Sequence, residues 1–370
     1  MEIEKDFVEK VMEKFGDKMT PLDRLGAFMT GGEMDRILIM PLIVSIAHRA
    51  STMTHREKRQ SPELMAKALL DSYERWGMDI LITEYGLHGL GQALGTEMND
   101  PEDSVPATTH HILQDLDDLD KLDFDLALKE NDPWLRKNIE AVEILVECVG
   151  DKIPIANLIS GPFTAATSIY PMDKMLRSLR KEPEKVHALM RKTTDAIKII
   201  YKELINAGAI IAQCDPIASG TILHIKQYKE FVKPYAKEVS DFIHECGGTN
   251  VYHICGDSST ITSDMVDTGC DILSIDNIVD LENVKKEVGN RVTILGNIDP
   301  VGVLYHGPKE DIEEAVREAI LKAYDSPNGY VLASGCDITQ NVPVENVDAF
   351  MAAGRKYGQL PINLELLKGE

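Results

Sequence analysis

Short β-like runs that alternate with amphipathic helical stretches are the feature that most limits what this chain can fold into. The stretches between the runs have helical periodicity, and several end in glycine, as helix C-termini commonly do. This alternation is typical of parallel βα units. Eight strands close a (β/α)₈ TIM barrel, so we predict that α/β fold, with a doubly wound open sheet as the alternative. The eight runs are residues 37–43, 79–83, 153–160, 209–214, 250–255, 271–275, 292–297 and 330–334.

The length of the chain fits one barrel with additions. The 370 residues exceed the roughly 250 that a TIM barrel typically needs. Residues 1–34 have helical patterns interrupted near Pro21 and Gly31, and we predict an N-terminal helical extension there. Residues 35–370 are predicted to form the TIM-barrel catalytic domain. Within it, residues from about 99 to 150 include a strongly acidic stretch and predict a solvated insertion with one or two helices.

Composition limits the partners and the compartment. A formal net charge of −22 would repel nucleic acid and anionic lipid, so we expect neither a nucleic-acid partner nor a membrane partner. The sequence has no apolar run of the roughly 18 residues that a spanning helix needs, and its N-terminus lacks the apolar core of a signal peptide. We therefore predict a cytoplasmic protein, whose six cysteines would be reduced thiols.

The sharpest candidate for chemistry is the stretch NVYHICGD. His253 and Cys255 lie two residues apart at the end of a β run. Side chains two apart on a strand point to the same face. In a parallel barrel, the C-terminal ends of the strands form the active-site rim. The pair is therefore predicted to lie at that rim, against the alternative of two buried residues that merely neighbour each other.

A second thiol follows another β run. Cys336 comes after Gly335 in YVLASGCDI, again at the C-terminal end of a predicted strand. One imidazole and two thiolates form the ligand set of a catalytic zinc that keeps a fourth position open, and thiolates favour zinc over magnesium or calcium. We therefore predict that His253, Cys255 and Cys336 bind one Zn²⁺. A structural zinc is the alternative, although structural sites usually have four protein ligands.

Other side chains at predicted strand ends are candidates for supporting roles. Glu84 could be the fourth zinc ligand, displaced by substrate, or a catalytic base. Asp215 could orient His253 or contact substrate. Tyr85, Tyr252 and Asn297 are predicted to line the pocket and contact the cofactor.

Several stretches resemble a known family. They are HICGD, SIDN at 274–277, LGNIDP at 295–300, ISGPFTAA at 159–166, and SGCDI with PVENVDAF within 334–350. Over roughly residues 35–360 the chain resembles the uroporphyrinogen decarboxylase superfamily, and more closely its zinc-dependent corrinoid methyltransferase branch. That resemblance implies a TIM barrel with its site at the C-terminal strand ends. It also implies methyl transfer between a corrinoid and a small thiol or methoxy compound.

One difference from the decarboxylases in this family favours methyl transfer over decarboxylation. The decarboxylases carry an arginine-rich N-terminal segment, whereas the matching region here offers only Arg49 in a comparable setting. A metal-independent tetrapyrrole decarboxylase is therefore the alternative function. The sequence shows no corrinoid-binding domain, so the corrinoid (cobalamin) is expected to be presented by a separate corrinoid protein.

Overall fold

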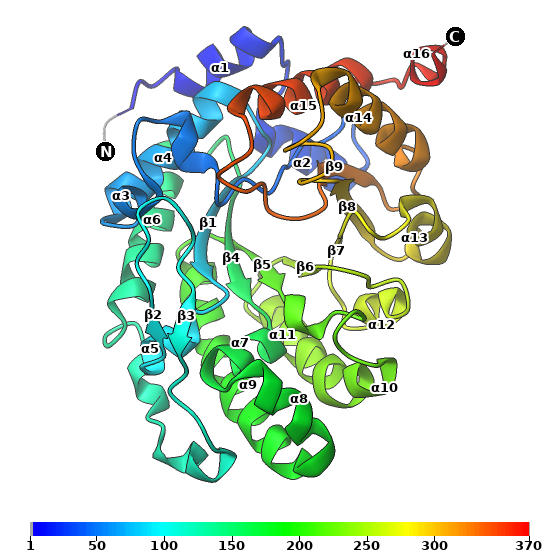
Figure 1. Ribbon diagram of the computed structural model, residues 1–370. Coiled ribbons are helices and arrows are strands. Elements are labelled where there is room, and N and C mark those ends of the chain that lie inside the picture. The colour runs from blue at the N-terminus through cyan, green and yellow to red at the C-terminus, as the bar shows by residue number, and fades with distance from the viewer. Residues whose placement is uncertain (1–2, 370) are drawn as a thin grey trace.

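The computed structural model describes residues 3–369 and shows a curved parallel sheet wrapped by helices (Figure 1). In this part of the chain the sheet has seven strands in the order β1-β4-β5-β6-β7-β8-β9. Each strand is parallel to its neighbour, as the alternation of βα units predicted. The strands are β1 (Leu81–Gly86), β4 (Ile155–Ser160), β5 (Ile210–Cys214), β6 (Asn250–Ile254), β7 (Ile272–Ile275), β8 (Thr293–Ile298) and β9 (Tyr330–Ser334).

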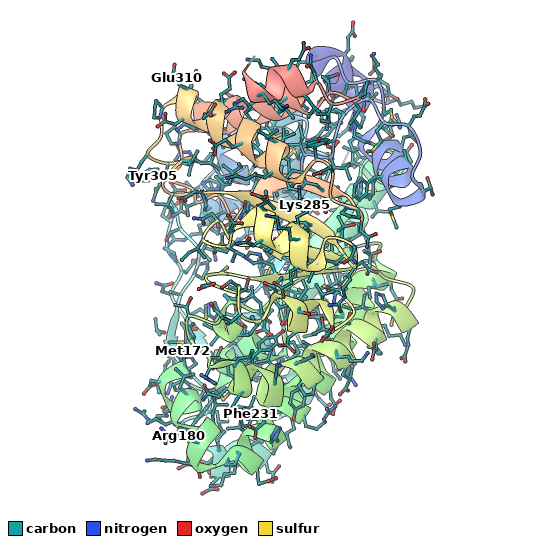
Figure 2. All side chains as sticks on the ribbon, turned by 90° about the vertical axis from the view of Figure 1, so that its right-hand side faces the viewer. Met172, Arg180, Phe231, Lys285, Tyr305 and Glu310 are labelled. Atoms are coloured by element: carbon teal, nitrogen blue, oxygen red, sulfur yellow. The ribbon has the colours of Figure 1, made fainter. Side chains whose placement is uncertain are left out.

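Helices cover the outer face of the sheet. Figure 2 shows this layer from the side, with Lys285 on α13 and Glu310 at the start of α14. The helices are α1 (Phe7–Phe15), α2 (Pro21–Thr30), α3 (His55–Lys58), α4 (Pro62–Trp76), α5 (Gly89–Leu94), α6 (Pro133–Val149), α7 (Pro162–Ile169), α8 (Met172–Lys181), α9 (Pro183–Asn206), α10 (Ile225–Gln227), α11 (Lys233–Glu245), α12 (Thr262–Val266), α13 (Leu281–Val288), α14 (Lys309–Ala323), α15 (Val344–Tyr357) and α16 (Leu364–Lys368). Among these described helices none is long and apolar enough to cross a bilayer.

The α4 helix shows how local sequence sets an element's ends. The Ser61 side chain accepts a hydrogen bond from the Leu64 amide, and Pro62 occupies the first helical turn, where its missing N–H costs nothing. Gly77 ends the helix with φ of 60°, a left-handed conformation that glycine adopts without steric cost. The same start and stop signals make the helical stretches recognisable in the sequence.

The first predicted strand is the part of the barrel that differs from expectation. Residues 37–43 form no regular strand, and within them Ile39 alone makes an isolated bridge, to Leu332 of β9. The Met40 amide donates to the Leu332 carbonyl at 2.9 Å, and the Asp79 amide donates to the Ile39 carbonyl at 2.9 Å. The segment therefore lies between β9 and the chain just before β1, in the position of the eighth strand. The fold is that of a TIM barrel, with this one position irregular.

Buried charges fix the segment at the N-terminal end of the barrel. The Asp79 carboxylate is fully buried and accepts hydrogen bonds from Arg24 at 2.5 Å, Arg36 at 2.6 Å and the Ile39 amide at 2.7 Å. Arg24 on α2 also binds Asp35. Burial opposes ionisation of Asp35, but hydrogen bonds from Arg24 and backbone amides outweigh it and hold its pKa well below the usual value. This network joins α2 to the edge of the barrel.

Residues 99–150 combine short elements with one long helix. The hairpin of β2 (Glu97–Met98) with β3 (Thr108–His110) leads into the short helices η2 (Leu116–Lys121) and η3 (Phe124–Ala127), and then into α6. The α6 helix connects β1 to β4 and buries Leu135, Ile139 and Val142 in the core. The division of the chain into an extension, a catalytic domain and an insertion stays a prediction.

Apolar side chains form two layers, one inside the barrel and one between the sheet and the helices. The inner cluster has Leu38, Met40, Leu42 and Val44 from the irregular first segment, together with Ile82 of β1 and others from β4, β8 and β9. The outer cluster is larger and contains Tyr252 and Tyr228. Successive residues of a strand thus alternate between a closed interior and the helical layer. This alternation decides which side chains reach the open mouth of the barrel.

Candidate metal centre

The β6 strand aims His253 into the barrel. In the parallel ladder His253 pairs with Cys214 of β5 and Ser274 of β7, so these three side chains lie on the same face of the sheet. Cys255 follows directly after the strand and points to the same side. The spacing of two residues therefore brings an imidazole and a thiol together, as the sequence predicted.

The third side chain comes from the end of β9. Cys336 lies two residues after Ser334, on a loop that packs against the loop following β7. A Cβ at Gly335 would lie only 2.4 Å from the Asn277 backbone nitrogen, so a residue without a side chain is needed there. This close approach brings Cys336 to Cys255 across the mouth of the barrel.

The three donor atoms form a compact group. His253 Nε2 lies 3.0 Å from Cys255 Sγ, and Cys255 Sγ lies 3.2 Å from Cys336 Sγ. One ligand atom from each residue falls within 4.8 Å of the other two. Bonds of about 2.0–2.3 Å in a tetrahedron would hold zinc ligands about 3.3–3.8 Å apart. The separations of 3.0 Å and 3.2 Å are slightly shorter than this range, and all three atoms lie within 4.8 Å of one another, so small side-chain shifts would fit the group to one Zn²⁺ ion. The donor chemistry also suits zinc.

The two thiols are electrostatically unequal. The contact between the two Sγ atoms, together with His253, holds the pKa of Cys336 below that of a free thiol. The same contact, together with burial, raises the pKa of Cys255. A thiolate is the form that ligates a metal, so both cysteines would be deprotonated around a bound ion.

Hydrogen bonds from neighbouring residues hold the candidate zinc ligands in place. His253 Nδ1 lies 3.0 Å from the hydroxyl of Ser274, which leaves Nε2 facing the thiols. Asp276 accepts a hydrogen bond from the Gly256 amide at 2.8 Å and fixes the turn after Cys255. A partner on the far nitrogen sets the tautomer and orientation of a ligating histidine.

Replacing Ser274 with alanine is expected to weaken zinc binding by roughly 10-fold to 100-fold, because His253 loses the group that orients its ring. Competition with a chromophoric chelator measures the change in affinity. Ser240→Ala is the matched control, since its buried hydroxyl accepts from Asn250 away from the donor group. Equal zinc affinity in the Ser274 variant and the wild type would contradict the role assigned to Ser274.

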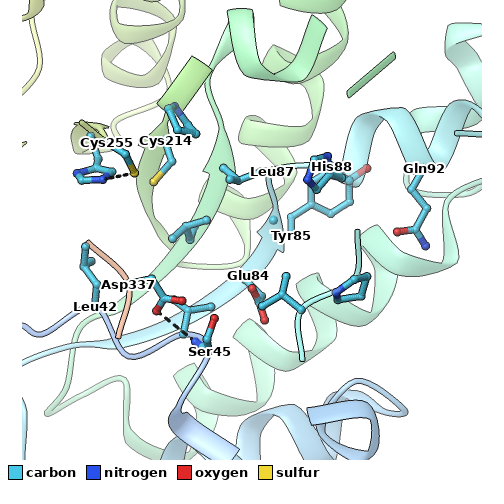
Figure 3. A pocket seen from close by; sticks show the side chains of 18 of the residues that line it. Leu42, Ser45, Glu84, Tyr85, Leu87, His88, Gln92, Cys214, Cys255 and Asp337 are labelled. Atoms are coloured by element: carbon cyan, nitrogen blue, oxygen red, sulfur yellow. Dashed lines mark hydrogen bonds between the residues drawn. The ribbon is translucent and has the colours of Figure 1, made fainter. Parts of the chain in front are cut away.

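The donor group opens into a cavity of about 230 Å³. Figure 3 shows Cys255, Cys214 and Asp337 toward one end of this cavity and Tyr85, His88 and Gln92 toward the other. The walls come from the irregular first segment, from β1 and the chain after it, and from the ends of β4, β5, β6 and β9. The cavity therefore lies at the C-terminal ends of the strands, where a parallel barrel places its active site.

Glu84 lies in the cavity wall, but Lys58 holds its carboxylate. Lys58 Nζ donates to Glu84 Oε1 at 3.0 Å and to the Val44 carbonyl at 2.9 Å. His55 lies beside this pair, with Nε2 3.9 Å from the same oxygen. Burial, followed by the charge of Lys58, lowers the pKa of His55 to about 2, so His55 is neutral. Among the described residues the compact donor group has only His253 and the two cysteines, and a ligand or base role for Glu84 stays a prediction.

Asp215 has partners other than the expected one. Its carboxylate is buried and accepts hydrogen bonds from the Thr164 amide at 2.6 Å and the Phe163 amide at 3.4 Å, at the N-terminal end of α7. Burial raises its pKa to about 6. The ring of His253 is oriented by Ser274 instead, and Asp215 meets His253 only through a backbone hydrogen bond of 2.8 Å. A catalytic role for Asp215 stays a prediction.

The three predicted cofactor contacts lie in different places. Tyr85 lines the cavity, and its hydroxyl donates to Asp132 at 2.7 Å. Tyr252 belongs to the outer cluster between the sheet and the helices, on the opposite face of β6 from His253. Asn297 donates to the carbonyls of Asp276 and Val279 and so fixes the loop after β7. Of the three, the structure brings only Tyr85 to the cavity that contains the donor group.

Three cavity features were missed by sequence reasoning. Asp337 is partly buried beside Cys336 and accepts a hydrogen bond from the Ser45 amide at 3.2 Å, and desolvation raises its pKa to about 7. Cys214 lines the cavity, and Lys58 anchors Glu84. Asp337 could have been found because it follows Cys336 in the sequence, and Cys214 because it pairs with His253 in the sheet. Lys58 lies on α3, and the pattern of strand ends does not predict where that helix lies.

Comparison with known proteins shows which family the chain belongs to. A model of the family described as uroporphyrinogen decarboxylase (URO-D) matches residues 20–357, most of the chain. The chain belongs to the uroporphyrinogen decarboxylase family. Within the family, the methylcobamide:CoM methyltransferase MtaA of Methanosarcina barkeri is 30% identical over 307 residues, which cover 81% of this chain and 86% of that protein.

Other similar proteins include both uroporphyrinogen decarboxylases and methyltransferases. A uroporphyrinogen decarboxylase of Mannheimia succiniciproducens is 30% identical over 63% of this chain and 68% of its own. A solved structure of a methyltransferase from Methanosarcina mazei superposes with a TM-score of 0.81 and 28% identity, and covers 92% of this chain and 99% of that one. The likeness to methyltransferases extends over most of the chain, and this member of the family is a methyltransferase enzyme.

Proposed function

We propose that this chain is a zinc-dependent methyltransferase that moves a methyl group between a corrinoid, carried by a separate corrinoid protein, and a small thiol or methoxy compound. The observation that carries the proposal is the convergence of His253, Cys255 and Cys336 within 4.8 Å beside an internal cavity. Relatives named methylcobamide:CoM methyltransferases support the corrinoid and the thiol as partners.

A bound zinc ion would stabilise the thiolate form of a substrate thiol, or draw electron density from a methoxy oxygen, and either effect assists displacement at the methyl carbon. His253, oriented by Ser274, and the two cysteines would hold the ion. The two thiolates would offset its charge, and the cavity beside the three donors has space for a substrate. The chain thus provides a fixed place for the sulfur or oxygen that carries the methyl group.

The surrounding residues position the substrate and exclude water. Leu42, Val44 and Leu158 line the cavity with carbon, which lowers the local dielectric and strengthens electrostatic interactions at the donor group. The pair of Lys58 and Glu84 places one carboxylate oxygen in the wall at a fixed orientation. The methylated corrinoid would approach over the open mouth of the barrel.

A methyl-transfer assay tests the proposal. The zinc-loaded protein is mixed either with free methylcobalamin and a panel of thiols or with cob(I)alamin and a panel of methoxy compounds, and the cobalt absorption spectrum is followed. We expect enzyme-dependent conversion in at least one direction. If neither cobalamin is converted while uroporphyrinogen is decarboxylated, the alternative function of a tetrapyrrole decarboxylase is correct instead.

Replacing Glu84 with glutamine is expected to lower kcat about 10-fold to 100-fold while zinc stays bound in equal amount, because the protein would still hold the ion through three ligands. Steady-state methyl transfer and metal analysis on the same samples measure the two effects. Glu57→Gln is the control, since Glu57 caps α3 on the surface. Wild-type kcat in the Glu84 variant would rule out both roles predicted for this carboxylate.

A further inference from the structure

Arg59 is the single lysine or arginine among the described residues that line the cavity. It follows directly after α3, and 15% of its side chain is exposed. Its Nε donates to the His55 carbonyl at 3.3 Å, and its Nη2 donates to Asp100 at 2.9 Å and to the Pro101 carbonyl at 3.3 Å. These contacts fix the plane of the guanidinium. Its Nη1 has no hydrogen-bond partner in the described part of the chain, so the N–H groups of that nitrogen are free for a ligand.

The carboxylate that pairs with Arg59 does not cancel its charge inside the cavity. The Asp100 side chain is 64% exposed, and its second carboxylate oxygen lies 3.0 Å from Nε of Arg56. Water screens an exposed ion pair, so this contact is weak. The neighbouring Lys58 is bound to Glu84 and neutralises that carboxylate of the wall. Arg59 is therefore the cation that the wall leaves for a ligand.

The surroundings of Arg59 favour a strong contact with an anion. Met98, Val105 and Pro106 come from the same stretch of chain as Asp100 and line the cavity with carbon. Apolar surroundings lower the local dielectric and strengthen an ion pair. The Gln92 side chain also lines the cavity, at the end away from Cys255 (Figure 3), and its amide makes no hydrogen bond to the described residues. This amide can donate to the same anion.

We propose that Arg59 binds an acidic group of the small substrate, which is a short thiol, methyl thioether or methoxy compound that ends in a sulfonate or carboxylate. The inference rests on the proposed function, because the sulfur or oxygen of this molecule would meet the candidate zinc ligands. Burying an anion is costly unless it is paired, and Nη1 of Arg59 supplies the partner. An engineered cavity of about 150 Å³ binds benzene. At about 230 Å³, this cavity has room for such a short molecule.

Binding of matched thiols tests the inference without requiring turnover. Isothermal titration calorimetry of the zinc-loaded protein compares mercaptoethanesulfonate and mercaptopropionate with uncharged mercaptoethanol. We expect an anionic thiol to bind at least about 10-fold more tightly, as one charge-assisted hydrogen bond would give. Tight binding of only one of the two anionic thiols supports the inference and identifies the acid. Equal or weaker binding of both would overturn it.

The variant Arg59→Gln separates a binding role from a structural one. It should lose the preference for anionic thiols, because an amide has no charge, and keep the wild-type affinity for mercaptoethanol and the wild-type zinc content. Arg59→Lys retains the charge and should keep part of the preference. Arg56→Gln is the matched control, since Arg56 binds the same Asp100 carboxylate but is not among the described residues that line the cavity. This control should keep the full preference.

Two results for Arg59→Gln would overturn the inference. One is an unchanged preference for anionic thiols, and the other is an equal loss of affinity for charged and uncharged thiols, which would indicate a structural role. Because these measurements need no corrinoid, they are separate from the methyl-transfer assay. Failure of that assay with mercaptoethanol and every other thiol and methoxy compound would instead remove the proposed function.

Discussion

Replacing Cys336 with serine is expected to remove zinc binding at one ion per chain and to lower methyl transfer by about 1000-fold or more. Metal ions supply several kcal/mol of stabilisation to a developing charge, and about 4 kcal/mol corresponds to a factor of about 1000 in rate. Cys336 supplies one of the three donor atoms, so its loss removes an anionic ligand. Metal analysis after dialysis and the cobalamin assay measure the two quantities.

Cys246→Ser is the control for this prediction. Cys246 is a partly buried free cysteine at the end of α11, outside the donor group. This variant should bind zinc and transfer methyl groups like the wild type. Circular dichroism distinguishes the loss of a ligand from the loss of the fold, because the Cys336 variant should keep its helical signal. Full zinc content and full activity in that variant would refute the assignment of Cys336.

Replacing Asp79 with asparagine is expected to destabilise the fold by about 3 kcal/mol or more. Removing one partner of a buried ion pair leaves an uncompensated charge, and such losses amount to about 3–5 kcal/mol. Asp79 is bound by two arginines and by the Ile39 amide, so its loss also loosens the irregular segment that occupies the eighth strand position. Urea unfolding, followed by circular dichroism, gives the change in the free energy of unfolding.

The matched control is a surface ion pair. Asp241→Asn breaks the contact with Lys237, and both side chains are about half exposed. Such pairs contribute about 0–1 kcal/mol, so little change in stability is expected. A change in the Asp79 variant as small as that of the control would mean that the buried network does not hold the N-terminal helices and the first segment to the barrel.

The fold could be predicted because its repeating unit is local. Seven of the eight β-like runs are strands in the described part of the chain, since each is a buried aliphatic run between amphipathic helices. The run at 37–43 has the same apolar character but forms a single isolated bridge. Its position is set by Asp79 and by the arginines Arg24 and Arg36, contacts between residues distant in sequence that no local pattern reveals.

The three donor residues could also be predicted from the sequence. The residues around them could be predicted only in part. His253 and Cys255 share a face because they are two residues apart, and strand ends of one sheet meet at one rim. Tyr252 is next to His253 on the same strand, so its side chain points to the opposite face, toward the helices. This alternation could have been read from the sequence, but the prediction that Tyr252 lines the site did not use it. Ser274 required knowledge of the register between β6 and β7, and Lys58 required the position of α3. These depend on tertiary structure.

X-ray absorption spectroscopy at the zinc edge of the zinc-loaded protein tests whether His253, Cys255 and Cys336 bind one ion. We expect two sulfur ligands at about 2.3 Å and one imidazole nitrogen at about 2.0–2.1 Å, with a light atom completing the shell. In the Cys336→Ser sample any remaining signal should have fewer sulfur ligands. A shell of oxygen and nitrogen alone in the wild-type protein would contradict the metal centre proposed for His253, Cys255 and Cys336.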